Sequence, residues 1–139
     1  MPHQVVIDTN VLVAAARSST GASFEVLRLF AAGDARWQWN VSTALLVEYE
    51  AVLKREQHRQ GRGMAVVDRF LDDVAARANR LAIFYLIRPY LADADDEFVL
   101  ELALASASDY IVTHNRSDFR AAERFGVRVV TPGEFLQII

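Results

Sequence analysis

The chain has 139 residues, the length of one domain, and a domain of this size buries roughly two-thirds of the surface that its unfolded form exposes. Hydrophobic residues make up 53% and charged residues 24%, which excludes an intrinsically disordered protein. Because cysteine is absent, disulfides, thiolate metal sites and a cysteine nucleophile are excluded, and any metal must be bound by oxygen or imidazole. The net charge of −3 argues against a strongly basic nucleic-acid-binding protein.

The N-terminal segment shows no charged region followed by a long apolar region and a cleavage site, the pattern of a signal peptide. The longest apolar run, residues 81–87, is much shorter than the roughly 20 residues that cross a bilayer. We therefore expect a cytoplasmic protein with no membrane segment.

Strands and helices alternate along the chain, with no repeat or composition break. Short runs of apolar and β-branched residues predict strands at 4–7, 36–41, 81–86, 110–113 and 127–130. Helical periodicity and capping residues predict helices at 11–16, 24–33, 42–54, 66–74 and 93–107, and a short one after Pro132. Parallel neighbours need crossover helices, so this order predicts one α/β domain over residues 1–139, a three-layer α/β/α sandwich with a central parallel sheet of about five strands.

Acidic residues recur where ligands bind in such folds, beyond the carboxyl ends of the strands. Asp8 directly follows the first strand, and Asn115 and Asp118 follow the fourth. At about 100° per residue, Asp96 shares the helix arc of the apolar residues Val99, Leu100, Ala103 and Ala107, whereas Glu97 points away. Glu48 flanks the apolar stripe of its helix, so we expect Asp8, Glu48, Asp96 and Asp118 to face one pocket.

A group of ionised carboxylates directed inward needs compensation, and a hard divalent cation supplies it. Each acid also has a structural interpretation that stays open. Asp8 and Asp118 could cap helices, Asp96 could complement a helix dipole, and Glu48 could lie on a solvated helix face, as Glu50 does beside Lys54. These interpretations do not explain why acids recur at strand ends.

The run from Val5 to Val13, which contains Asp8-Thr9-Asn10, resembles the opening motif of the PIN-domain ribonucleases. Three further segments resemble the next motifs of that family in order, and the resemblance spans essentially the whole chain. These segments are 42–53 with Glu48, 95–103 with Asp96, and 113–119 with Asp118.

The resemblance implies a Mg²⁺- or Mn²⁺-dependent endoribonuclease, similar to the VapC-type toxins of toxin-antitoxin pairs, with an antitoxin partner and a homodimeric state. By position, Asp8 and Asp96 would be the principal metal ligands, and Glu48 and Asp118 would complete the catalytic acids. The supporting residues would be Thr9, Asn10, Thr113 and Asn115. Many relatives have an aspartate where this chain has Asn115, so the fourth acidic position lies between Asn115 and Asp118.

RNA also needs a positive approach surface. The best candidate is the segment 54–62, and the loop around Arg116 is a second; a solvated helix face is the alternative for both. The predicted RNA-binding residues are Lys54, Arg55, Arg59, Arg62 and Arg116. His114, next to the expected pocket, is a candidate for an accessory role.

Two other enzyme classes that gather acids at strand ends fit less well. A receiver domain needs a lysine after the fifth strand, where this chain has Thr131-Pro132, and a haloacid-dehalogenase-type phosphatase needs a second aspartate where it has Asn10. The remaining alternative is a PIN-fold scaffold or binding module in RNA processing, catalytically weak because of Asn115.

Overall fold

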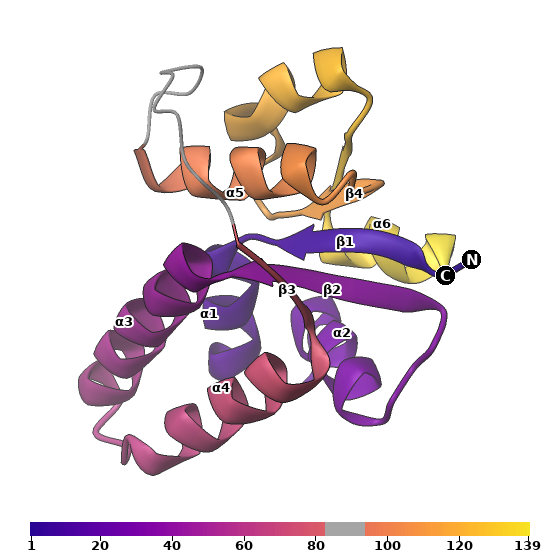
Figure 1. The fold of residues 1–139 in the computed structure, drawn as a ribbon. Helices are drawn as coiled ribbons and strands as arrows, with labels where there is room; N and C mark the ends of the chain where they lie inside the picture. Colours follow the sequence, from indigo (N-terminus) through magenta and orange to yellow (C-terminus); the bar gives the residue numbers. More distant parts are fainter. Residues whose placement is uncertain (83–93) are drawn as a thin grey trace.

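The computed structural model describes residues 1–82 and 94–139 of the chain (Figure 1). Five parallel strands form one sheet in the order β3-β2-β1-β4-β5. The strands are β1 (His3–Ile7), β2 (Trp37–Ser42), β3 (Asn79–Leu81), β4 (Tyr110–Val112) and β5 (Arg128–Val130). The helices are α1 (Thr9–Arg17), α2 (Ala22–Ala31), α3 (Thr43–Arg59), α4 (Ala65–Arg77), α5 (Ala94–Ala105), α6 (Pro132–Ile138) and the 3₁₀ segment η1 (Arg116–Phe125).

Helices cover both faces of the sheet, which confirms the predicted three-layer α/β/α sandwich. In Figure 1, α5 and the orange-yellow η1 segment lie on one face, and α1 to α4 lie on the other. Helix α6 packs against α2. Because both faces are covered, the central strand β1 is apolar throughout its second half, and Val5, Val6 and Ile7 are fully buried.

The strand order places a topological switch point between β1 and β4. From β1 the chain adds β2 and then β3 on one side, and it returns to add β4 and β5 on the other. In open parallel sheets the crevice at such a point, beyond the carboxyl ends of the strands, is where ligands bind. The predicted acidic residues Asp8 and Asp118 follow the two strands that border it.

The element boundaries differ from the sequence prediction most at the third strand. We expected residues 81–86, but β3 begins at Asn79, and residues 83–86 lie outside the part of the chain that the structure describes. The polar Asn79 enters the sheet because its amide donates to Asn40 Oδ1 on β2 over 2.9 Å. An apolar pattern cannot indicate a strand whose first residue is held by an amide contact.

The third helix begins where the sequence predicts. Ser42 ends β2 and caps α3, accepting a hydrogen bond from the backbone N–H of Leu45 over 3.1 Å. Within residues 1–82 and 94–139, no helix is both long enough and apolar enough to cross a bilayer.

Candidate active site

Asp8 lies at the switch point and connects the two strands that border it. Its backbone N–H donates to the carbonyl of Val112, the last residue of β4, over 2.9 Å. Its side chain is directed into the structure and the residue is only 8% exposed. Asp8 also caps α1, since its Oδ1 accepts the N–H of Thr9 over 2.8 Å. The capping interpretation of Asp8 is therefore correct, and it fixes the carboxylate at the crevice.

Thr113, directly after β4, is the centre of a hydrogen-bond network around Asp8. Its hydroxyl oxygen accepts from the amide of Asn10 over 3.3 Å and from the backbone N–H of Asn115 over 3.0 Å. Both partners are N–H donors, so the single hydroxyl proton donates to Asp8 Oδ2, 2.8 Å away. Thr113 has no exposed surface. The network therefore orients the Asp8 carboxylate from a fixed position.

Asn10 extends the network to the loop after β4. Its Oδ1 accepts the backbone N–H of His114 over 3.3 Å. The His114 ring contacts α2, with Nε2 hydrogen-bonded to the Ser23 hydroxyl over 2.7 Å. Asp8, Asn10, Thr113 and Asn115 are thus brought together, whereas the His114 ring connects this loop to α2.

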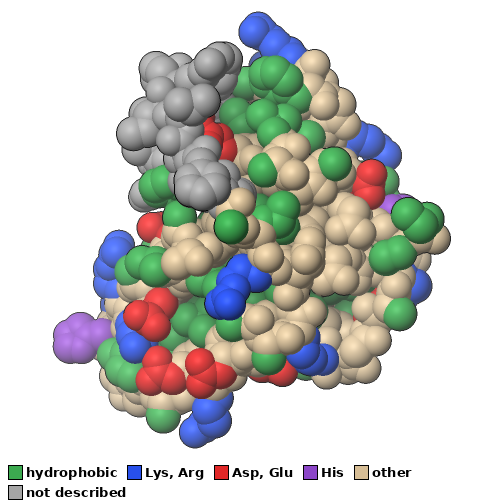
Figure 2. Space-filling view, in the orientation of Figure 1, with side chains coloured by type: hydrophobic (Ala, Val, Ile, Leu, Met, Phe, Trp, Pro, Cys, Tyr) green, Lys and Arg blue, Asp and Glu red, His purple; other side chains and the backbone are tan. Residues whose placement is uncertain are grey.

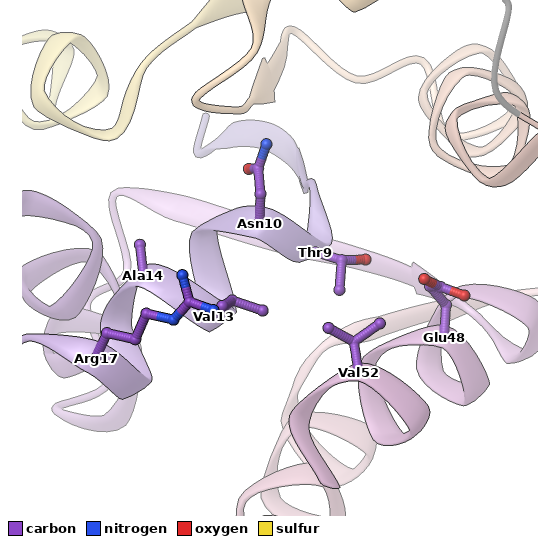
Figure 3. A pocket seen from close by; sticks show the side chains of 7 residues that line it. All are labelled: Thr9, Asn10, Val13, Ala14, Arg17, Glu48 and Val52. Atoms are coloured by element: carbon purple, nitrogen blue, oxygen red, sulfur yellow. The ribbon is translucent and has the colours of Figure 1, made fainter. Parts of the chain in front are cut away.

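A pocket of about 500 Å³ opens between α1 and α3 next to this network (Figure 3). Figure 3 shows Glu48 and Arg17 at its opposite ends, with Val13 and Val52 between them. The complete lining is Thr9, Asn10, Val13, Ala14 and Arg17 from α1, and Glu48 and Val52 from α3. Glu48 is partly buried and faces the pocket, so a purely solvated helix face does not describe it.

Helix α5, which carries Asp96, packs against both β1 and α3. Asp96 is partly buried. Glu97, which we expected to point away, is partly buried as well, and its Oε2 is shielded from solvent. Helix α5 contacts the sheet and also η1, so a wider arc of it is covered than one apolar stripe indicates.

The two candidates for the fourth acidic position are both exposed. Asn115 is joined to the network through its backbone N–H, and it precedes η1. Asp118 lies in the first turn of η1, where its backbone N–H donates to the carbonyl of Asn115 over 3.0 Å. Asp118 is therefore connected to the Asp8 network through one more hydrogen bond than Asn115 is.

Comparison with protein families matches residues 4–117 to the PIN domain, most of the chain and all of the network described above. The chain belongs to the PIN-domain family. PIN domains are in general nucleases, hydrolases that act on nucleic acids and typically use divalent metals. A search of curated proteins gives no match.

Within the part of the chain that the structure describes, the acids of this PIN domain form no compact metal cage. Among residues 1–82 and 94–139, no group of three or more histidine, aspartate or glutamate side chains could hold a metal ion. Mg²⁺ seldom uses such cages, because it keeps several waters and binds through one or two carboxylates and the substrate phosphate. The carboxylate oxygens of Asp8, Glu48 and Asp96, on segments that pack together, are of the chemical type that this mode of binding requires.

Most of the basic residues predicted to contact RNA already have partners. Lys54 pairs with Asp68 over 2.9 Å, Arg59 with Glu56 over 2.7 Å, and Arg116 with Glu134 over 3.3 Å. Arg55 and Arg62 are exposed, and Arg62 donates to the Ala16 carbonyl over 3.4 Å. On the face in Figure 2, acidic and basic side chains are interspersed over α3 and α4. The predicted positive surface is therefore not one continuous field on this face.

Sequence patterns missed Tyr49, which positions α3. Its phenol is fully buried and donates to the carbonyl of Ile7, the residue before Asp8. Burial raises the pKa of the Tyr49 phenol, so it stays a neutral donor. Since Glu48 is its neighbour in sequence, this contact sets the position of Glu48 relative to β1. In the sequence, Tyr49 is indistinguishable from the rest of an apolar stripe.

Proposed function

We propose that the whole chain, residues 1–139, is one Mg²⁺- or Mn²⁺-dependent endoribonuclease domain that cleaves single-stranded RNA. Asp8, Glu48, Asp96 and Asp118 are its catalytic acids, and Asp8 and Asp96 are the metal ligands. One observation carries the proposal: Thr113 and Asn10 fix the buried Asp8 carboxylate at the switch point of a PIN domain, next to the pocket that contains Glu48.

The chain's own residues position the reacting groups. Thr9 and Thr113 each donate to one oxygen of Asp8, Asn10 joins α1 to the loop after β4, and Asn115 closes the network. When bound, the metal supplies a water of lowered pKa and stabilises negative charge at the leaving oxygen. The half-buried Lys54 and the exposed Arg55, Arg59, Arg62 and Arg116 would contact the RNA backbone.

Cleavage of a labelled single-stranded RNA by the purified protein tests the proposal. We expect cleavage with Mg²⁺ or Mn²⁺ that EDTA stops, and that Asp8→Asn or Asp96→Asn abolishes while the circular dichroism spectrum stays unchanged. Glu48→Gln should also reduce the rate. Its matched control is Glu50→Gln, on the same helix but 53% exposed and beside Lys54, which should cleave like the wild type. Cleavage that persists in both aspartate variants would refute the proposed site.

We further propose that this nuclease is the toxin of a toxin-antitoxin pair, acting in the cytoplasm as a homodimer. A second pocket of about 780 Å³ between α1, α2, α3 and α4 supports an antitoxin partner. Its lining is mostly apolar and includes the exposed side chains of Phe24 and Val66, with Arg28 and Arg62 among the basic residues. An apolar antitoxin segment flanked by acidic residues complements this surface.

Co-expression with the product of an adjacent small gene tests the toxin assignment. The antitoxin should relieve growth inhibition and co-purify with the protein, and Phe24→Asp should prevent both. If the protein inhibits growth and the adjacent gene product does not relieve the inhibition, the toxin-antitoxin assignment is wrong, although the nuclease proposal stands. Light scattering of the purified protein gives the oligomeric state.

The alternative is a PIN-fold scaffold in RNA processing with a weak metal site. Asn115 at an expected acidic position and the lack of a three-acid group among the described residues favour it. RNA binding without cleavage, under every divalent cation tried, would select the scaffold over the nuclease.

A further inference from the structure

One face of α1 leads from the Asp8 network into the pocket and ends at Arg17. Asn10, Val13, Ala14 and Arg17 follow the i, i+3, i+4, i+7 spacing of a single helix face, and all four line the pocket. The rise of an α-helix puts Arg17 about 10 Å beyond Asn10 along the axis. Arg17 was not among the residues that the sequence indicated for RNA contact.

Arg17 is held in place by a partner on α3. Its Nε donates to Glu56 Oε1 over 2.7 Å and its Nη2 to Glu56 Oε2 over 3.0 Å. Glu56 itself is only 5% exposed and also accepts from Arg59 and Gln60. A bidentate contact of this kind fixes the plane of the guanidinium.

The contact to Glu56 leaves the Arg17 guanidinium with further N–H donors and with positive charge. Its side chain is 54% exposed, and within residues 1–82 and 94–139 its remaining N–H groups have no hydrogen-bond partner. Arg17 and Arg59 share one carboxylate, so the three side chains keep one positive charge in excess. The cluster can therefore bind an anion without breaking the contact to Glu56.

The pocket thus has a carboxylate at one end, a guanidinium at the other, and an apolar floor of Val13, Ala14 and Val52 (Figure 3). A ligand that matches it carries a metal-bound anion at one end, an apolar surface in the middle and a second anion at the other end. A nucleic-acid strand has this pattern, because its backbone carries a negative charge at every phosphate and its sugars and bases present apolar surface between them.

We propose that Arg17 binds a backbone phosphate other than the one that is cleaved, at the far end of the pocket, and that Glu56 is its positioning residue. The pocket floor then packs against the sugar or base of the intervening nucleotides. This inference rests on the proposed nuclease function, whose site it extends. Because the contact is to the backbone, it contributes affinity for any sequence.

Fluorescence anisotropy with a short labelled single-stranded RNA at several salt concentrations tests the contact. Measurements in the Asp8→Asn background keep the RNA intact. Adding Arg17→Ala should weaken binding about tenfold at low salt. It should also lower the slope of log K against log salt by about 0.7, the value for one phosphate contact on a single strand. A side chain with a merely structural role would not change this slope.

Arg17→Lys should keep the salt slope, since it keeps the charge, with part of the affinity. Arg28→Ala is the matched control, because the Arg28 side chain is equally exposed at 55% but lines only the second pocket, whereas Arg17 lines both pockets. In the cleaving protein, Arg17→Ala should raise KM and leave kcat unchanged. If Arg17→Ala leaves both the KM and the salt slope unchanged while the wild type cleaves RNA, the Arg17 proposal is wrong and the proposed function stands. A wild type that neither binds nor cleaves RNA would overturn the proposed function.

Discussion

At the scale of single residues, Thr113 is the side chain on which the candidate site depends most. It is fully buried, and its hydroxyl contacts Asp8, Asn10 and the backbone of Asn115 at once. Threonine and valine have nearly the same shape, so the hydroxyl can be removed without opening a cavity. Its contribution can therefore be measured separately from packing.

We predict that Thr113→Val lowers kcat/KM for RNA about ten- to a hundredfold, the usual cost of losing a residue that orients a metal ligand. The buried groups left without a partner should cost about 1–3 kcal/mol of stability. RNA cleavage and thermal unfolding measure the two effects. Thr113→Ser, which restores the hydroxyl, should recover most of the activity. Wild-type cleavage by Thr113→Val would show that the network does not position Asp8 for catalysis.

The sequence could indicate Asp8 because a polar residue directly after an apolar strand has a specific meaning in a parallel sheet, whereas Thr113 is indicated only by the family resemblance. The sequence could not indicate Arg17. Arginine near the end of a helix is ordinary, and its partner Glu56 lies 39 residues further along the chain. Contacts of that kind depend on how two helices meet, which local patterns do not contain.

At the scale of elements, α1 and α3 are connected by the pair between Arg17 and Glu56. The hydrogen bonds from Arg17, Arg59 and Gln60 hold the pKa of the Glu56 carboxyl far below its ordinary value of 4.5. A depressed folded-state pKa means that the unfolded chain takes up a proton first as the pH falls. The stability from Glu56 is therefore complete above about pH 5 and is lost progressively below it.

We predict that Glu56→Gln lowers the Tm at pH 7 and that the difference from the wild type shrinks below pH 4.5, the ordinary pKa of the group. Thermal unfolding followed by circular dichroism across this range measures it. Glu25→Gln is the control, because Glu25 pairs with Arg28 within α2 at 41% exposure and should change the Tm little. A Tm difference that is independent of pH would mean that Glu56 acts through packing and not through its charge.

The order of strands and helices could be predicted because each type of element has its own hydrophobic period. The position of β3 could not, because Asn79, Asn40 and Gln4 form a row of amide contacts across three strands. Each of these side chains looks like a loop or surface residue in the sequence. Their pairing becomes favourable only when the strands are already adjacent.

At the scale of the whole molecule, the fold brings together the segments that carry Asp8 and Asp96. Asp8 directly follows β1, and Asp96 lies on α5, which packs against β1. Bringing carboxylates together during folding is unfavourable unless a cation binds the folded form. A metal that binds only the folded state must stabilise it by mass action. Metal binding can therefore be detected without any nuclease assay.

We predict that Mg²⁺ at about ten times its Kd stabilises the protein by about 1.4 kcal/mol. In a domain of this size that raises the Tm by about 5 °C. Differential scanning calorimetry measures the shift, with NaCl at matched ionic strength as the salt control. Asp8→Asn and Asp96→Asn should remove the shift, whereas Glu50→Gln should keep it, because Glu50 is exposed beside Lys54. A shift of equal size in all three variants would place the bound metal elsewhere, and no shift in the wild type would favour the scaffold over the nuclease.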